Sequence, residues 1–333
     1  MVVLGITTTR TPTIFSLMIF SLNRINIHGI QFLTLLSSFL YSTLFACTMA
    51  VFTRMVATLF WFFAPIFIGT IFAQSGASRP VITIKGSDTM VILVQRWTEM
   101  FPDKTKVQFQ VTGGGSGTGI SALINGTTDI CSSSRPIKSS EVKQLREKHK
   151  YNGLEIRVAR DGIAVYLNTS NPVQNLTVGQ VKRIFTGEIT NWKELGGNDA
   201  KIVLYSRENN SGTYEFFKEH VLQKQDFAPQ TQHMVGTGAL VNAVAKDPNA
   251  IGFGGIAYSS GVKPAALAFS ENSRYVLPKE EDILNGNYPV SRLLYFYMKE
   301  RPNGAVKQFV DWVISKQGQA VVSEVGYLPT KKF

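Results

Sequence analysis

The sequence predicts an α/β fold for the chain after residue 79. Short apolar runs alternate there with segments whose apolar residues recur every three or four positions, which is the pattern of alternating strands and helices. Hydrophobic residues make up 44% of the chain and charged residues 17%, which excludes a disordered chain and a coiled coil. Neither a tandem repeat nor a low-complexity linker interrupts residues 80–333, so we expect two lobes that pack closely against each other.

The first elements after residue 79 establish this alternation. Residues 81–85 form an apolar run typical of a strand, and Gly86-Ser87-Asp88-Thr89 separates this run from a helix over residues 90–100 that Pro102 ends. Further elements expected in this part are a strand at 106–111, a loop at 113–119, a helix starting with 120–125 and a strand at 129–131.

The same alternation continues to the C-terminal part of the sequence. Residues 251–255 read as a buried strand whose glycines permit a close neighbour. The other expected elements are strands at 163–168, 202–205 and 293–298, helices at 178–185, 213–221 and 305–314, and a loop at 206–212.

Residues 1–79 differ sharply from the rest, because they contain no Asp or Glu and only four arginines. Within them, residues 55–73 form an apolar run with Arg54 before it and small polar residues after it, the pattern of a secretory signal peptide. A run of about 19 apolar residues could also remain as a membrane anchor, but Pro65 and Gly69 interrupt it. We therefore expect residues 1–79 to be an export signal region, cleaved after Ala73 or Ala77, and the mature protein to be periplasmic.

A second apolar stretch at 30–53 suggests that translation starts later, at Met49 or Met55, and that Cys47 is incidental. Cys131 is then the one remaining cysteine and is expected to be a small buried residue. Two cysteines and four histidines without metal-ligand spacing predict no disulfide framework, no metal centre and no cofactor.

Three loops share one construction, an apolar strand followed by Gly, Ser and Thr and then a helix. They are residues 86–89, 113–119 and 209–213. The start of a helix presents unpaired N–H groups and a positive dipole end, and glycines and hydroxyls let a ligand approach and bond. Any one of these loops could simply be a helix cap, but three of them, two with an arginine beside them, favour an anion site.

These loops do not match the known nucleotide-binding and hydrolase motifs. Gly119 is followed by Ile120 where a Walker loop needs lysine, and Thr118 stands where G-x-G-x-x-G and G-x-S-x-G both need glycine. Arg135 and Arg207 instead supply guanidinium groups, which form bidentate bonds to tetrahedral oxyanions. Residues 80–333 carry 30 basic and 23 acidic residues, a net charge of +7 that suits an anionic ligand.

These loops, with Arg135 and Arg207, give the sequence a specific resemblance to the phosphate-binding proteins of bacterial phosphate ABC importers, the PstS-type family. The resemblance runs from about Ile82 to Tyr327. It also includes Asp161-Gly162-Ile163-Ala164, the segments 184–192 and 250–253, and Tyr288-Pro289-Val290-Ser291-Arg292-Leu293-Leu294-Tyr295.

The resemblance implies a two-lobed, type II periplasmic-binding-protein fold with the ligand cleft between the lobes. Lobe one would hold residues 80–165 and 291–333, and lobe two residues 166–290. The family's phosphate contacts carry over to Ser87, Thr89, Met90, Ser116, Gly117, Ser134 and Arg135 in lobe one and to Arg207, Ser211, Gly212 and Thr213 in lobe two.

The sequence departs from some members of the family at Ser134, where they have a carboxylate that accepts the ligand's proton and helps to reject sulfate. Asp88 is the nearest carboxylate that could take this role, with Glu208 second, although Asp88 could equally cap a helix. Selectivity for phosphate therefore stays open at this point, and sulfate, molybdate or an organophosphate are the alternative ligands.

The function implied is a monomeric, non-enzymatic receptor that captures inorganic phosphate and delivers it to the permease and ATPase subunits of an ABC importer. The alternative from another class is a phosphatase-type enzyme using Ser116 or Ser211, against which the lack of an acidic metal cluster counts. Nucleic-acid binding is not expected, because the basic helix face formed by Lys138, Lys143, Arg146, Lys148 and Lys150 lacks interleaved aromatic residues.

Overall fold

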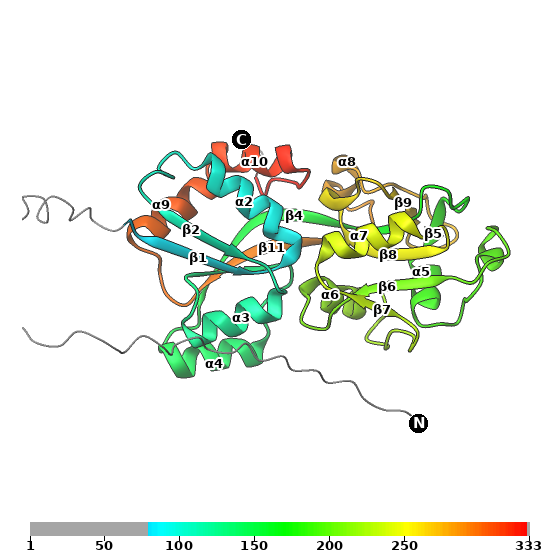
Figure 1. The fold of residues 1–333 in the computed structure, drawn as a ribbon, viewed down its shortest axis with the longest axis horizontal. Coiled ribbons are helices and arrows are strands. Elements are labelled where there is room, and N and C mark those ends of the chain that lie inside the picture. Colours follow the sequence, from blue (N-terminus) through cyan, green and yellow to red (C-terminus); the bar gives the residue numbers. More distant parts are fainter. Residues whose placement is uncertain (1–78, 332–333) are drawn as a thin grey trace, which may run out of the picture. The chain divides into compact units, whose positions relative to one another are not determined.

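The computed structural model describes residues 79–331, which form alternating strands and helices (Figure 1). The export signal predicted for residues 1–79 lies outside the described residues except for Arg79. In the described part, no helix is both long and apolar enough to span a bilayer.

The elements, given below in chain order, fall into two groups joined by the long strand β4, and those from residue 291 onwards belong with the first group. Before and including β4 they are β1 (Val81–Gly86), the 3-10 helix η1 (Asp88–Met90), α2 (Val91–Met100), β2 (Gln108–Thr112), α3 (Ser116–Asn125), β3 (Ile130–Ser133), α4 (Ser139–His149) and β4 (Leu154–Leu167). After it come β5 (Asn175–Thr177), α5 (Val178–Phe185), η2 (Trp192–Leu195), β6 (Val203–Arg207), α6 (Gly212–His220), β7 (Gln232–Met234), α7 (Thr237–Lys246), β8 (Ala250–Gly255), η3 (Ile256–Tyr258), β9 (Lys263–Pro264), β10 (Ala266–Ala268), α8 (Glu280–Leu284), β11 (Ser291–Met298), α9 (Gly304–Val313) and α10 (Lys316–Val325).

A nine-stranded mixed sheet runs through the whole described structure in the order β2-β1-β3-β11-β4-β8-β6-β7, with β9 paired to β4. β4 is the strand on which the two groups meet, because its residues Leu154–Gly162 pair with β11 and Ile163–Leu167 pair with β8, antiparallel in both cases. β11 returns the chain to the first group, antiparallel to β3. One continuous strand and one returning strand thus connect the two halves of the sheet (Figure 1).

Each half of the sheet is covered by helices on both faces, because successive side chains of a strand point to opposite faces. Around β11, Leu294 and Phe296 face α2, α9 and α10, whereas Tyr295 and Tyr297 face α3 and α4. Around the second half of β4, residues such as Ile163 and Val165 face a core shared with α5 and α6, and Tyr166 faces α7. The described residues therefore form four hydrophobic clusters, two for each half of the sheet.

Most predicted elements are present, and the differences lie at the edges of the predicted loops. The helix after the glycine-rich loop begins at Ser116, within the segment predicted to be a loop, and β6 extends to Arg207, because its last residues pair with β7. β4 begins at Leu154, nine residues before the predicted start, because charged residues interrupt the apolar pattern of a segment that pairs with β11. Short or glycine- and alanine-rich helices such as α7 and α8 are not among the predicted elements.

Candidate functional site

The three predicted loops follow the carboxyl ends of β1, β2 and β6, and the serine triplet closes β3. Gly86 makes the first turn possible, because its φ of +149° is unfavourable for other residues and a Cβ atom there would lie 2.0 Å from the carbonyl oxygen of Ser132. The Ser87 amide donates to that same Ser132 oxygen at 2.9 Å. The backbone contact between β1 and β3 therefore fixes where residues 87–89 point.

Hydroxyl groups from distant parts of the chain meet in pairs at this edge of the sheet. The Oγ1 atoms of Thr89 and Thr213 lie 2.9 Å apart, although the residues are 124 positions apart in the chain. The Oγ atoms of Ser116 and Ser134 lie 3.2 Å apart, and the Ser134 amide donates to Ser116 Oγ at 3.0 Å. All four side chains are buried, so the structure brings these predicted residues of both groups together.

The start of α6 approaches this hydroxyl cluster with its backbone. A Cβ atom on Gly212 would lie 2.3 Å from Ser116 Oγ and 2.8 Å from Ser134 Oγ, so glycine is needed for the close approach. Ser211 caps the helix, since its Oγ accepts from the amides of Thr213 and Tyr214. The cap interpretation holds for Ser211, whereas in the described structure Ser87 makes no side-chain cap bond and α3 begins after Gly115.

Two of the predicted backbone donors already have partners within the chain. The Met90 amide donates to Ser87 O at 3.0 Å, and the Gly117 amide donates to Asn210 O at 3.0 Å. Asn210 in turn donates from Nδ2 to Gly114 O at 3.1 Å. The second and third loops therefore contact each other directly through the backbone.

Arg207 and Asp88 form an ion pair between the two groups of elements. Arg207 Nη2 lies 2.6 Å from Asp88 Oδ2, and Arg207 also donates to Thr237 Oγ1 at 2.8 Å. Asp88 Oδ1 accepts from the Gly114 amide at 2.8 Å, so this carboxylate orders the second loop instead of capping its own short helix. The side chain of Arg207 is 2% exposed and that of Asp88 is 18% exposed.

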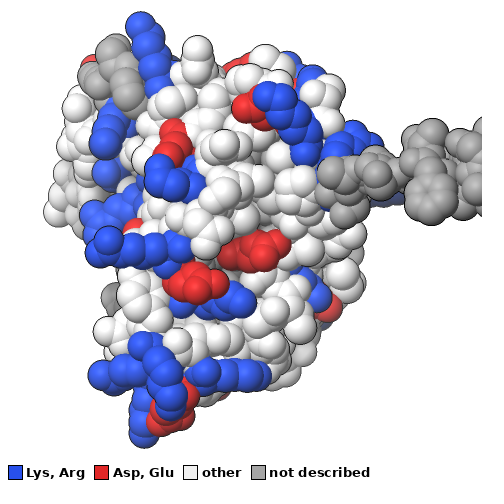
Figure 2. All heavy atoms as spheres, turned by 90° about the vertical axis from the view of Figure 1, so that its left-hand side faces the viewer, with Lys and Arg blue, Asp and Glu red and all other residues white. Residues whose placement is uncertain are grey.

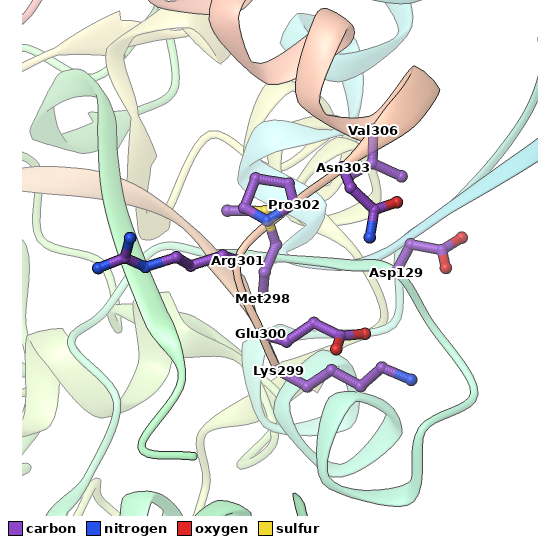
Figure 3. Close-up of a pocket in the computed structure, with 8 residues that line it drawn as sticks. All are labelled: Asp129, Met298, Lys299, Glu300, Arg301, Pro302, Asn303 and Val306. Atoms are coloured by element: carbon purple, nitrogen blue, oxygen red, sulfur yellow. The ribbon is translucent and has the colours of Figure 1, made fainter.

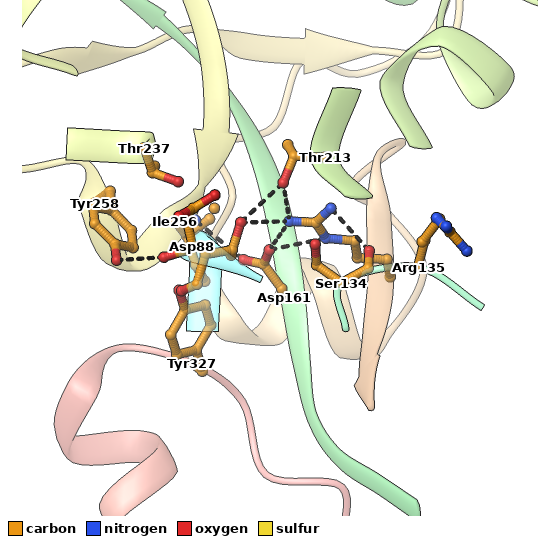
Figure 4. A network of polar contacts seen from close by, with 12 residues as sticks. Asp88, Ser134, Arg135, Asp161, Thr213, Thr237, Ile256, Tyr258 and Tyr327 are labelled. Carbon is orange, nitrogen blue, oxygen red and sulfur yellow. Dashed lines mark hydrogen bonds and ion pairs between the residues drawn. The ribbon is translucent and has the colours of Figure 1, made fainter. Parts of the chain in front are cut away.

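Arg135 is predicted to bind the anion, but its guanidinium does not contact the hydroxyl cluster. It donates from Nη1 and Nη2 to Glu141 at 2.9 and 2.8 Å, and its Nε lies 3.0 Å from Glu215 Oε2. Figure 4 shows the Arg135 side chain directed away from the network around Asp88 and Asp161. Burial alone would lower the pKa of Arg135, but the hydrogen bond and charge of Glu141 and the charge of Glu215 raise it overall.

Asp161 and Arg292 belong to the site but are missing from the predicted contact set. Asp161 Oδ2 lies 2.9 Å from Arg292 Nη2, and both side chains are buried where β4 and β11 pair. Burial raises the pKa of Asp161, and the charge and hydrogen bond of Arg292 counteract part of this rise. The signal that could have found Arg292 is that it is the one charged residue of β11, and Asp161 stands directly before the apolar run 162–167 of β4.

Arg292 also donates to the hydroxyls of Thr89 and Thr213. Its Nη2 donates to Thr213 Oγ1 at 3.0 Å and to Thr89 Oγ1 at 3.4 Å, and its Nη1 donates to Ser134 O at 3.0 Å. A hydroxyl that accepts a bond from a guanidinium keeps its own proton free to donate. Of the two protons that Thr89 and Thr213 carry, one lies in the bond between these hydroxyls, and the other is free to donate to a ligand.

The chemistry of this site is that of a hydrogen-bond donor cluster with paired charges. Hydroxyls, helix N-termini and Arg207 are suited to hold a compact oxyanion. Among the described residues, no group of three or more His, Cys, Asp or Glu could hold a metal ion. The three described histidines, His149, His220 and His233, each contact a main-chain carbonyl oxygen.

A separate surface pocket of about 110 Å³ lies at the start of α9 (Figure 3). Residues 298–303 and Asp129 line it, and Asp129 is already bonded to the Thr83 amide and hydroxyl at 2.8 Å. Figure 2 shows basic side chains spread over this side of the molecule with acidic ones between them. None of the residues predicted for the anion site lines this pocket.

Comparison with known proteins gives consistent matches. Residues 73–317 match the model of the PBP superfamily domain. Phosphate-binding protein PstS of Pseudomonas aeruginosa is 36% identical over 77% of this chain and 84% of its own length, and that of Bacillus subtilis is 32% identical over 74% and 80%.

Solved structures agree with these relatives. A substrate-binding protein from Clostridium perfringens, solved with bound phosphate, has 33% identity and a TM-score of 0.70 over 75% of this chain and 100% of its own. An ABC-type phosphate transport receptor from Vibrio cholerae has 29% identity and a TM-score of 0.60, over 74% of this chain and 99% of its own. The chain therefore belongs to the PstS family of phosphate-binding proteins, within the PBP superfamily.

Proposed function

We propose that the chain is a receptor that binds inorganic phosphate at the hydroxyl cluster between the two groups of elements and delivers it to an ABC importer. The observation that carries the proposal is the meeting of Thr89 with Thr213 and of Ser116 with Ser134, beside the buried Arg207. Four hydroxyls, two helix N-termini and a guanidinium present donors to a tetrahedral anion from several directions. The names of the relatives support phosphate as that anion.

Two lobes would close around the anion, lobe one with residues 80–165 and 291–333 and lobe two with residues 166–290. The separate hydrophobic clusters support this division, and the crossing strand β4 and the chain entering β11 would act as the hinge. The anion contacts would be Ser87, Asp88, Thr89, Met90, Ser116, Gly117 and Ser134 from lobe one and Arg207, Ser211, Gly212 and Thr213 from lobe two. The amides of Met90 and Gly117 would exchange their bonds to Ser87 O and Asn210 O for bonds to the anion. Arg135 is assigned a different role below.

Calorimetric titration of the purified protein with phosphate and with sulfate tests this function. We expect saturable binding of phosphate at one site and much weaker binding of sulfate at neutral pH. Stronger binding of sulfate, molybdate or an organophosphate would assign the site to that anion instead. Turnover of a phosphate ester that is lost on replacing Ser116 or Ser211 would favour the phosphatase alternative.

Asp88 is the proposed acceptor for the proton that phosphate carries at neutral pH and sulfate lacks. Asp88 stands between Ser87 and Thr89 in the sequence, and its side chain is partly exposed beside Arg207. An unmet contact between sulfate and a carboxylate costs at least about 1–3 kcal/mol. Asp88→Asn is therefore expected to raise sulfate affinity towards that for phosphate, measured by parallel titrations. If the variant keeps its preference for phosphate, Asp88 does not determine selectivity, and its role is limited to its bonds to Arg207 and Gly114.

Export is part of the proposed function, because a receptor of this kind works outside the cytoplasmic membrane. We propose that the mature, monomeric protein begins between Gln74 and Pro80, works in the periplasm and docks on the permease and ATPase subunits of the importer. The support is the signal-like run at residues 55–73. N-terminal sequencing of the protein purified from cells that express it tests the position of the mature N-terminus, and a protein that retains residues 55–73 would contradict the proposal.

A further inference from the structure

The carboxylate of Glu215, in α6, forms ion pairs with two cations, Arg135 and Lys138, which lie between β3 and α4. Its Oε2 atom lies 3.0 Å from Arg135 Nε and 2.6 Å from Lys138 Nζ. The Arg135 side chain is 5% exposed, that of Glu215 22% and that of Lys138 55%. A single carboxylate oxygen is therefore shared by one buried and one exposed cation.

The two sides of this contact belong to different cores. Arg135 and Lys138 lie between β3 and α4, whose buried residues Cys131 and Leu145 share one hydrophobic cluster. Glu215 lies on α6 next to Phe216 and Phe217, which belong to the cluster around α5 and β8. The ion pairs thus connect residues next to two different hydrophobic clusters, close to strand β11, whose Arg292 lies over the Phe216 ring at 5.6 Å.

Arg135 is held in place on its own side by Glu141. The two-pronged bond to Glu141 fixes the guanidinium plane, and Glu141 also accepts from the Lys138 amide at 2.8 Å. In the described structure Arg135 Nε makes no aligned hydrogen bond, so its contact with Glu215 is chiefly electrostatic. The bonds of Arg135 to Glu141 do not involve Glu215, so they can stay in place when the contact with Glu215 breaks.

Helix α6 links this contact to the anion site. Ser211 caps the helix, Gly212 and Thr213 are its first two residues, and Glu215 lies one turn after the cap. Attraction of Glu215 towards Arg135 and Lys138 draws the helix start towards Ser116 and Ser134, where Gly212 leaves no room for a Cβ atom. The ion pairs and the close approach of Gly212 to Ser116 and Ser134 therefore both favour closure of the two lobes on each other.

We propose that Glu215, Arg135 and Lys138 form a clamp between the lobes that holds the closed state and slows release of the bound anion. Arg135 is then a positioning residue that acts through Glu215 and does not contact the ligand. The proposal rests on the proposed function only for the identity of the anion. A contact present only in the closed state shifts the equilibrium between open and closed forms and so changes the rate of dissociation.

The test measures phosphate affinity and dissociation rate for the wild-type protein and for Glu215→Gln. The substitution keeps the shape of the side chain and removes its charge, and we expect the Kd to rise about 10- to 100-fold, mainly through faster dissociation. Glu219→Gln is the matched control, because Glu219 lies exposed on the same helix. It is expected to leave both constants unchanged.

Two further measurements separate a clamp from a merely structural role. Lys138→Gln changes an exposed side chain and is expected to raise the dissociation rate by up to about fivefold, so it decides the question even if Glu215→Gln fails to fold. Raising the salt concentration is expected to speed dissociation more in the wild type than in Glu215→Gln, because the ion pairs are screened.

The outcomes that overturn the clamp are distinct from those that overturn phosphate binding. Unchanged dissociation rates in both Glu215→Gln and Lys138→Gln, or an equal salt effect in wild type and Glu215→Gln, contradict the clamp even when the wild type binds phosphate. A wild-type protein that does not bind phosphate contradicts the proposed function. In that case, the same variants are measured with the oxyanion that the titrations identify.

Discussion

Replacing Arg207 with alanine is expected to weaken phosphate binding about 150- to 5000-fold, from a loss of about 3–5 kcal/mol. The side chain is almost fully buried and holds Asp88 Oδ2 at 2.6 Å. Its removal takes away a buried positive charge beside the hydroxyl cluster and leaves the Asp88 carboxylate bonded to the Gly114 amide but with no cation beside an incoming anion. Both effects oppose binding, so the change in affinity should exceed that of any exposed basic residue.

Lys143→Ala is the control for this measurement, because Lys143 is 71% exposed on α4 and its partner Glu147 lies 3.9 Å away. A solvated pair of this kind is worth about 0–1 kcal/mol. Calorimetric titrations of both variants with phosphate give the comparison. Equal affinities for the Arg207 and Lys143 variants would place the anion elsewhere on the protein.

Gly86→Ala is expected to lower the free energy of unfolding by about 3 kcal/mol or more. The new Cβ atom would lie 2.0 Å from the Ser132 carbonyl oxygen, and the φ of +149° is unfavourable for alanine. Because both obstacles are backbone features, relief requires β1 and β3 to move apart, which also displaces Ser87 and Thr89. Urea denaturation followed by circular dichroism measures the loss.

Gly286→Ala separates the two contributions to this loss. Gly286 has a φ of +73°, but nothing lies within 4 Å of the position of its Cβ atom. Its replacement should therefore cost only the conformational strain, about 1–2 kcal/mol. Equal losses at Gly86 and Gly286 would mean that a small local shift removes the contact with Ser132.

The repeated strand, loop and helix pattern of the sequence predicts the parts of the site that depend on local structure. Ser87, Thr89, Ser116 and Thr213 are predicted because Gly, Ser and Thr at a helix start are a local signal, and the structure brings three of these four into hydroxyl pairs. Arg207 is predicted by its place next to such a loop, and it is buried against Asp88. The α/β class follows from periodicity in the same way and is confirmed.

Only the tertiary structure decides which charges face one another. Arg135 has the same local setting as Arg207, a polar loop after a strand, yet its guanidinium binds Glu141 and Glu215. Asp161 and Arg292 are 131 positions apart and pair only because β4 and β11 are neighbours in the sheet. Periodicity reports the face on which a residue lies, whereas the partner of a charge depends on the pairing of distant strands and the approach of two separately packed cores.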